Sequence, residues 1–209
     1  MSIEKLFKHR SALMGIAILW IILFHSTFSI SNRVLGIIRE VGYGGVDIFA
    51  FVAGIGGYYS FSKNYNELAY YRRRVKRILS VYIPFMAVWL SYQVIINQMP
   101  IQAIIGNLFL LQRFTGLGYE FNWYLSYLVI TYAATPFLVQ MIDRIKKSGR
   151  VAIIVFIIAA ISVAFWKSEN LIIIIRIPLY IMGIYVGRLG KEGVFLRKKH
   201  IACLSLSLR

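Results

Sequence analysis

The chain has 209 residues, of which 59% are hydrophobic, and its mean hydropathy is +0.68. This apolar fraction is above that of soluble domains, so the composition excludes an ordinary soluble fold. The net charge of +16 is divided among loops between apolar segments, which is typical of membrane proteins and argues against a nucleic-acid-binding surface.

Six apolar segments, in chain order, approach the length needed to cross a hydrocarbon core of ~30 Å. We expect them at residues 12–30, 44–62, 78–96, 121–142, 150–166 and 171–187. The first is long and is followed by further spans, so we expect it to be retained rather than cleaved as a signal peptide. A shorter apolar stretch, 101–111, predicts a re-entrant or interfacial helix. The expected fold class is therefore all-α, a polytopic transmembrane helical bundle of about six spans plus one short helix.

The basic residues orient this bundle. They collect before the first span, between the second and third, between the fourth and fifth, and in the C-terminal tail, while the loop between the first two spans carries only Arg33 and Arg39. A cytoplasmic N-terminus places most of the 24 Lys and Arg residues on the inner side, as expected for membrane proteins. A full crossing by 101–111 would reverse every later loop, so the charges favour a multi-pass protein with both termini cytoplasmic.

The second span carries small residues at helical spacing. They form the pairs Ala50/Gly54 and Ala53/Gly57. Such pairs let helix backbones approach closely, so the pattern predicts tight packing and says nothing about catalysis.

Three ionisable residues fall within these apolar spans at a similar expected depth. With a rise of ~1.5 Å per residue, His25 and Arg176 lie about 8 Å, and Asp47 about 5 Å, below the outer end of their helices. Ionisable residues inside a membrane usually mark a function. In that case His25 suits a general base and Asp47 suits its orienting acid. The alternative is structural: His25 bonds a neighbouring helix, and Asp47 forms an ion pair with Arg176.

A basic run stands where the third span begins. Its cations are Arg72, Arg73, Arg74, Lys76 and Arg77. One interpretation is a positive-inside anchor that also binds anionic lipid heads. The other is a polyphosphate site, because arginine forks grip phosphate bidentately and the i, i+4 spacing aligns two cationic rows.

The start of the fourth span combines aromatic and polar residues. Trp123 belongs to an aromatic belt of the kind found at membrane interfaces. Glu120 and Asn122 alternatively point to a polar acceptor at the outer face.

Four blocks of sequence resemble the membrane acyltransferase-3 family, bacterial enzymes that O-acylate cell-surface glycans. The blocks are GIAILWIILFHS (15–26), GYGGVDIFAFVAGIGGYYS (42–60), RRRVKRILSVYIPF (72–85) and FNWYLSYLVITYAATPFL (121–138). Each is weak alone, but their order is specific. The resemblance implies one acyltransferase-3-like membrane domain over 1–209, in the bacterial inner membrane.

The resemblance also implies roles for residues. It implies that an acyl group, which we expect to be acetyl, moves from cytoplasmic acyl-CoA to a hydroxyl of a cell-surface or lipid-linked glycan. His25 matches the catalytic histidine, Asp47 the acid of the second block, and the basic run the site for the donor's phosphates. Many members carry Arg or Lys where this chain has Met14; Arg10, one turn earlier on the same helix face, is either the substitute in the donor site or an inner-face anchor. We assign Glu120, Asn122, Trp123 and Arg176 to the acceptor.

Two other interpretations stay open. Family members usually have more spans, and the chain ends in KKHIACLSLSLR, so we expect a domain that is incomplete at its C-terminus and an inactive fragment as one alternative. The other is a transporter or flippase component with His25, Asp47 and Arg176 along its path. We expect membrane lipid as a partner and no metal site, and the single cysteine, Cys203, excludes a Cys-based zinc site in particular. The sequence sets no oligomeric state.

Overall fold

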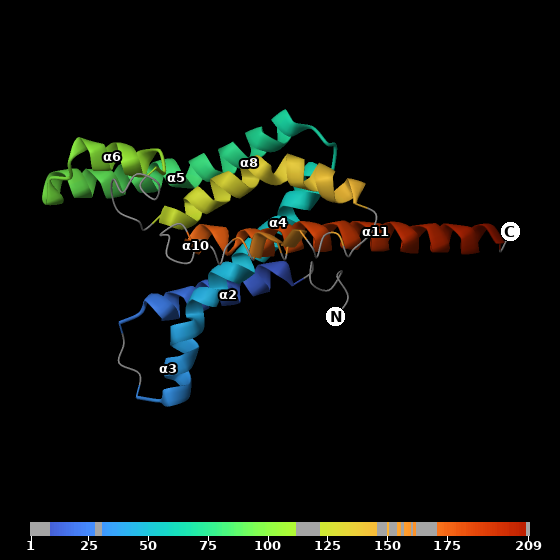
Figure 1. Ribbon diagram of the computed structural model, residues 1–209, viewed down its shortest axis with the longest axis horizontal. Helices are drawn as coiled ribbons and strands as arrows, with labels where there is room; N and C mark the ends of the chain where they lie inside the picture. The colour runs from blue at the N-terminus through green and yellow to red at the C-terminus, as the bar shows by residue number, and fades with distance from the viewer. Residues whose placement is uncertain are drawn as a thin grey trace.

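The computed structural model describes residues 9–27, 31–111, 122–145, 150, 154, 155, 157–159, 161 and 171–207, with side chains to residue 193 (Figure 1). The part of the chain that it describes is helical and contains no strand. The longer helices are α2 (Arg10–His25), α4 (Gly44–Phe61), α5 (Glu67–Asn97), α8 (Trp123–Arg144) and α11 (Ile177–Ser207). The shorter ones are α3 (Arg33–Glu40), α6 (Ile101–Leu108), α10 (Leu171–Ile174) and the 3-10 turn η1 (Val41–Tyr43).

Helix α4 is the central element, in contact with α2, α8 and α11 (Figure 1). Its glycines make two close crossings. A Cβ on Gly54 would overlap the carbonyl oxygen of Tyr180, and a Cβ on Gly183 would overlap that of Phe51, so α4 and α11 touch backbone to backbone. On another face, a Cβ on Gly45 would lie 2.6 Å from the carbonyl oxygen of Ala17 in α2. The tight packing predicted from the small residues of this span is therefore confirmed.

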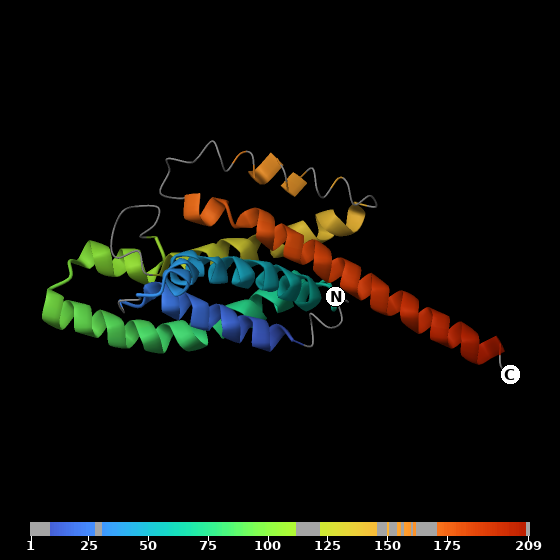
Figure 2. The same ribbon diagram turned by 90° about the horizontal axis from the view of Figure 1, so that it is seen from below.

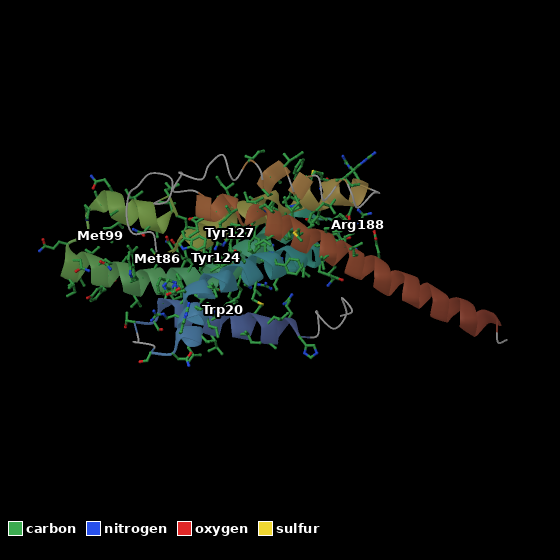
Figure 3. All side chains as sticks on the ribbon, turned by 60° about the horizontal axis from the view of Figure 1, so that its bottom comes forward. Trp20, Met86, Met99, Tyr124, Tyr127 and Arg188 are labelled. Atoms are coloured by element: carbon green, nitrogen blue, oxygen red, sulfur yellow. The ribbon has the colours of Figure 1, made fainter. Side chains whose placement is uncertain are left out.

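The core between α4, α8 and α11 is rich in tyrosine. Tyr127 and Tyr180 are fully buried, and each hydroxyl has a partner. Tyr180 shares a 2.5 Å hydrogen bond with Thr135, and Tyr127 donates to the carbonyl oxygen of Arg176 at 3.2 Å. Figure 3 shows Tyr124 and Tyr127 within the bundle and Arg188 further along α11. The buried hydroxyls of Tyr127 and Tyr180 are thus satisfied by hydrogen bonds.

A polar network joins the helices at the end where Arg188 lies. Asp143 accepts hydrogen bonds from Tyr65 at 2.7 Å and from Tyr58 at 3.2 Å. Lys191 donates to the carbonyl oxygen of Ser62 at 2.8 Å. Burial and the Asp143 hydrogen bond raise the pKa of the Tyr65 hydroxyl to about 12, so this group remains a donor over the physiological range. The network ties the α4–α5 turn to α8 and α11.

Within the described residues, three helical segments are long and apolar enough to cross a membrane: α5, α8 and residues 172–193. Helix α2 is apolar but shorter. The expected short helix at 101–111 is present as α6, which extends only about 12 Å and cannot cross alone. Most of the expected span at 150–166 lies outside the described residues. Six crossings and a cytoplasmic N-terminus stay predictions.

Two helix boundaries differ from the expected ones. The first helix ends at His25, where Ser26 turns extended and its hydroxyl donates back to the Leu23 carbonyl oxygen at 2.7 Å. His25 is therefore the last residue of α2, and it does not lie about 8 Å below the outer end of that helix as expected. The third span begins at Glu67, because the Asn66 side chain caps the helix by accepting from the Ala69 amide at 2.8 Å. The basic run is consequently helical throughout.

Candidate active site

Helices α2, α4, α5 and α8 enclose a cavity of about 260 Å³ that we call the arginine cavity. Three arginines line it: Arg10, Arg74 and Arg77. Its remaining walls are mainly apolar and aromatic: Met14, Phe49, Val52, Ala53, Gly56, Tyr124, Leu128 and Tyr132. A mostly apolar pocket with a few convergent charged groups is the usual form of a small-molecule site.

Arg74 is the buried cation of this cavity, with only 6% of its surface exposed. Its Nη2 donates to the Gly56 carbonyl oxygen at 2.9 Å, and its guanidinium lies 4.6 Å from the ring centroid of Tyr132. Its Nε has no hydrogen-bond partner. No carboxylate among the described residues pairs with it. A buried cation with only neutral partners is costly, so this cavity favours an anion.

Arg10 approaches the same stretch of α4. A Cβ on Gly56 would lie 3.6 Å from Arg10 Nη1, and the Gly56 carbonyl oxygen accepts from Arg74, so arginines from α2 and α5 both approach this residue. Arg77, one turn beyond Arg73 on α5, is exposed at the cavity wall. The three arginines therefore converge from helices that are far apart in sequence, which concentrates positive charge at one place.

The structure divides the basic run into two groups. Arg74 and Arg77 line the cavity, whereas Arg72, Arg73 and Lys76 are exposed and do not. Arg73 instead donates to the Ser60 carbonyl oxygen at 3.0 Å. This division follows from the helical turn, since residues three apart share a face and their neighbours point elsewhere.

Asp47 and Arg176 form an ion pair near the other end of α4. Arg176 Nε lies 2.9 Å from Asp47 Oδ1, although its N–H does not point at that oxygen. Arg176 is 2% exposed, donates from Nη1 to the Ile172 carbonyl oxygen at 2.7 Å, and stacks 5.2 Å from the Trp123 ring centroid. It lies in the break between α10 and α11. The ion pair between Asp47 and Arg176, which the sequence offered as a structural alternative, is therefore present.

His25 is exposed at the end of α2, with its ring edge-on to Phe24 at 5.0 Å. Neither an ion pair nor a hydrogen bond joins it to Asp47 in the described part of the chain. It lies about 22 Å along the helix axis from Arg10, at the opposite end of α2. The catalytic roles of His25 and Asp47 stay predictions.

The acceptor residues are placed as follows. Trp123 covers Arg176, and Asn122 is buried beside α6, with its Nδ2 3.5 Å from the Asn107 carbonyl oxygen. Glu120 lies outside the described residues. The aromatic walls of the arginine cavity were not expected from the sequence. Their signal is present, because Tyr124, Leu128 and Tyr132 recur every four residues along one face of α8.

The comparison with protein families decides the identity of the chain. A family model described as an acyltransferase domain, the acyltransferase-3 family, matches residues 12–208. The chain belongs to this family. Neither the curated proteins nor the solved structures contain a match to it. The acyltransferase-3 resemblance is therefore confirmed, and with it an acyltransferase domain on a framework of membrane helices.

Proposed function

We propose that this acyltransferase-3 protein moves an acyl group, acetyl in the simplest case, from cytoplasmic acyl-CoA to a hydroxyl of a cell-surface or lipid-linked glycan in the bacterial inner membrane. The observation that supports a phosphate-bearing donor most directly is Arg74. It is buried in a cavity, it lacks a carboxylate partner among the described residues, and it has an unpartnered Nε. Phosphate oxygens are the natural acceptors for such a group.

The donor's phosphates would bind Arg10, Arg74 and Arg77. CoA carries a diphosphate and a separate 3′-phosphate, which suits cations arriving from two helices. The thin pantetheine arm would then run from the arginine cavity toward the His25 end of α2. Phe49 and Tyr124, whose ring centroids are 6.2 Å apart, line the cavity on the side away from Gly56. Their apolar surface suits the arm and excludes water from it.

The transfer would occur at His25. Its imidazole takes the proton of the acceptor hydroxyl as the oxygen attacks the thioester carbonyl carbon, which forms the new C–O bond. The C–S bond then breaks, and the leaving thiolate takes the proton from the imidazolium, so the products are an ester and the CoA thiol. Asp47 is proposed as the acid partner of His25, a role that requires its carboxylate to leave Arg176. Glu120, Asn122, Trp123 and Arg176 are proposed to bind the acceptor.

The test is transfer of radiolabelled acetyl from acetyl-CoA in membranes that contain this chain or its His25→Ala variant. We expect label on glycan with the native chain and none with the variant, at equal membrane insertion. His25→Ala should leave acetyl-CoA binding intact, because His25 is remote from the arginines. Transfer that survives in His25→Ala would refute the role of His25.

A transporter or flippase component is the second candidate. The break between α10 and α11 beside the Asp47–Arg176 ion pair favours it, since broken helices with charged groups occur at transport sites. Such a protein has no need to bind acyl-CoA. Specific acyl-CoA binding therefore separates the two candidates.

A further inference from the structure

A second cavity, of about 340 Å³, lies between α5 and α8, and we call it the α5–α8 groove. Its lining is almost entirely apolar, apart from Arg77 on α5 and Asn122, the N-cap residue of α8. It is formed by Arg77, Ile78, Val81, Tyr82, Phe85, Asn122, Leu125, Leu128 and Tyr132. Arg77, Leu128 and Tyr132 also line the arginine cavity, so the two cavities adjoin at Arg77.

The groove presents a hydrocarbon surface with one cation at its end. Tyr82, the hydroxyl-bearing residue in its middle, already donates to the Asn107 carbonyl oxygen at 2.6 Å. Arg77 is exposed and has no carboxylate partner among the described residues. A ligand that fits both features has an anionic group and an apolar chain.

The groove also opens toward lipid. Both of its helices are long and apolar enough to cross a membrane. Along α5, Val81 is 72% exposed, and Val88, beyond the groove, is 75% exposed. An apolar helix surface of this kind contacts acyl chains in a bilayer. In Figure 2, α5 runs along one edge of the molecule, where such chains have access.

The length of the groove matches one lipid tail. From Arg77 to Phe85 the axis of α5 advances about 12 Å. A lipid tail reaches from the headgroups to the bilayer midplane, about 15 Å for a ~30 Å core. The basic run places Arg77 at the cytoplasmic headgroup level of α5, because cations collect there and attract anionic lipids.

We propose that the α5–α8 groove binds one anionic phospholipid of the cytoplasmic leaflet, with its phosphate on Arg77 and one acyl chain between α5 and α8. A zwitterionic lipid of equal chain length binds less well, since its headgroup carries a compensating cation. Arg77 lines both cavities, so a bound phospholipid would compete at this side chain with the phosphates proposed for the donor. The proposal does not depend on the acyl transfer reaction, and it is tested without any donor.

The experiment measures phosphatidylglycerol and phosphatidylcholine bound to the purified full chain, by native mass spectrometry from mixed micelles of stated composition. Two pairs of variants are compared, and the two variants of a pair carry the same type of substitution, one inside the groove and one outside it. Arg77→Gln and Arg72→Gln remove one exposed cation each, but only Arg77 lines the groove. Val81→Trp and Val88→Trp enlarge one exposed valine each, but only Val81 lines the groove. Because all four positions are exposed, the folded chain is retained.

We expect one tightly held phosphatidylglycerol, bound about tenfold more weakly by Arg77→Gln and Val81→Trp, as the loss of one charge-assisted hydrogen bond or of the tail site implies. Arg72→Gln and Val88→Trp should bind like the native chain. Equal loss in both arginine variants would show a general basic surface and overturn the proposal. Binding unchanged by Val81→Trp, or equal for the two lipids, would also overturn it.

Discussion

At the scale of single residues, two buried arginines differ in how their charge is compensated. Arg176 is buried but has Asp47, the Ile172 carbonyl oxygen and the Trp123 ring around it, so its charge is compensated. Arg74 is buried to a similar degree and has only neutral partners. The two side chains therefore differ in what they require. Arg176 is held in place at the break between α10 and α11, whereas the uncompensated charge of Arg74 favours an anion in the cavity.

The first prediction concerns the ion pair. Asp47→Asn should lower the free energy of unfolding by about 3 kcal/mol, because it leaves the buried Arg176 guanidinium with only neutral partners. Arg176→Met should cost less, since the Asp47 side chain is 36% exposed and its carboxylate stays partly hydrated. Reversible unfolding in mixed micelles measures both. A smaller loss for Asp47→Asn than for Arg176→Met would contradict this account of the pair.

At the scale of elements, the glycines of α4 determine how closely its neighbours approach. Gly54 and Gly183 let α4 and α11 meet at the backbone, and the Gly56 carbonyl oxygen accepts a hydrogen bond from Arg74. The helix thus uses one face for packing and another for the cavity. Its tight crossing with α11 also fixes Asp47 against Arg176.

The second prediction tests that crossing. Gly54→Ala should destabilise the fold by several kcal/mol or prevent it, because the new Cβ meets the Tyr180 backbone, which has no freedom to move aside. Gly15→Ala in α2 is the matched control: nothing lies within 4 Å of its Cβ, so alanine should stabilise the helix by up to about 1 kcal/mol. The melting temperatures of the two variants, measured by thermal denaturation, test this prediction. Equal melting temperatures would be incompatible with the close contact.

Much of the element pattern could be predicted from sequence, because apolar length and small-residue spacing are local signals. The α8 span, the short α6 and the tight faces of α4 follow from them. Helix α3 does not: it was expected as a loop between the first two spans, yet the Asn32 side chain caps it by accepting from Val34 and Leu35 amides. The end of α2 at His25 likewise depends on a local turn that hydropathy does not register.

At the scale of the whole molecule, the candidate site depends on which face of each helix turns inward. Sequence spacing indicates the basic run as a phosphate site but does not separate Arg74 and Arg77 from Arg72, Arg73 and Lys76. That separation requires α4 and α8 to be in place. The same holds for Asp47, whose expected depth matched both His25 and Arg176, while its contact is with Arg176 alone of the two. The depth of a residue along its helix can be predicted from the sequence, but the residues that its side chain faces depend on how the helices pack.

The family match and the arginine cavity together lead to one central claim, that Arg10, Arg74 and Arg77 bind the phosphates of an acyl-CoA donor. The most direct test is equilibrium binding of labelled acetyl-CoA to the purified chain and to its Arg74→Gln and Arg72→Gln variants. We predict that Arg74→Gln weakens binding by at least about tenfold, the worth of one hydrogen bond to a charged group, and that Arg72→Gln changes it little. Equal affinity of all three proteins, or no binding by the native chain, would contradict the claim.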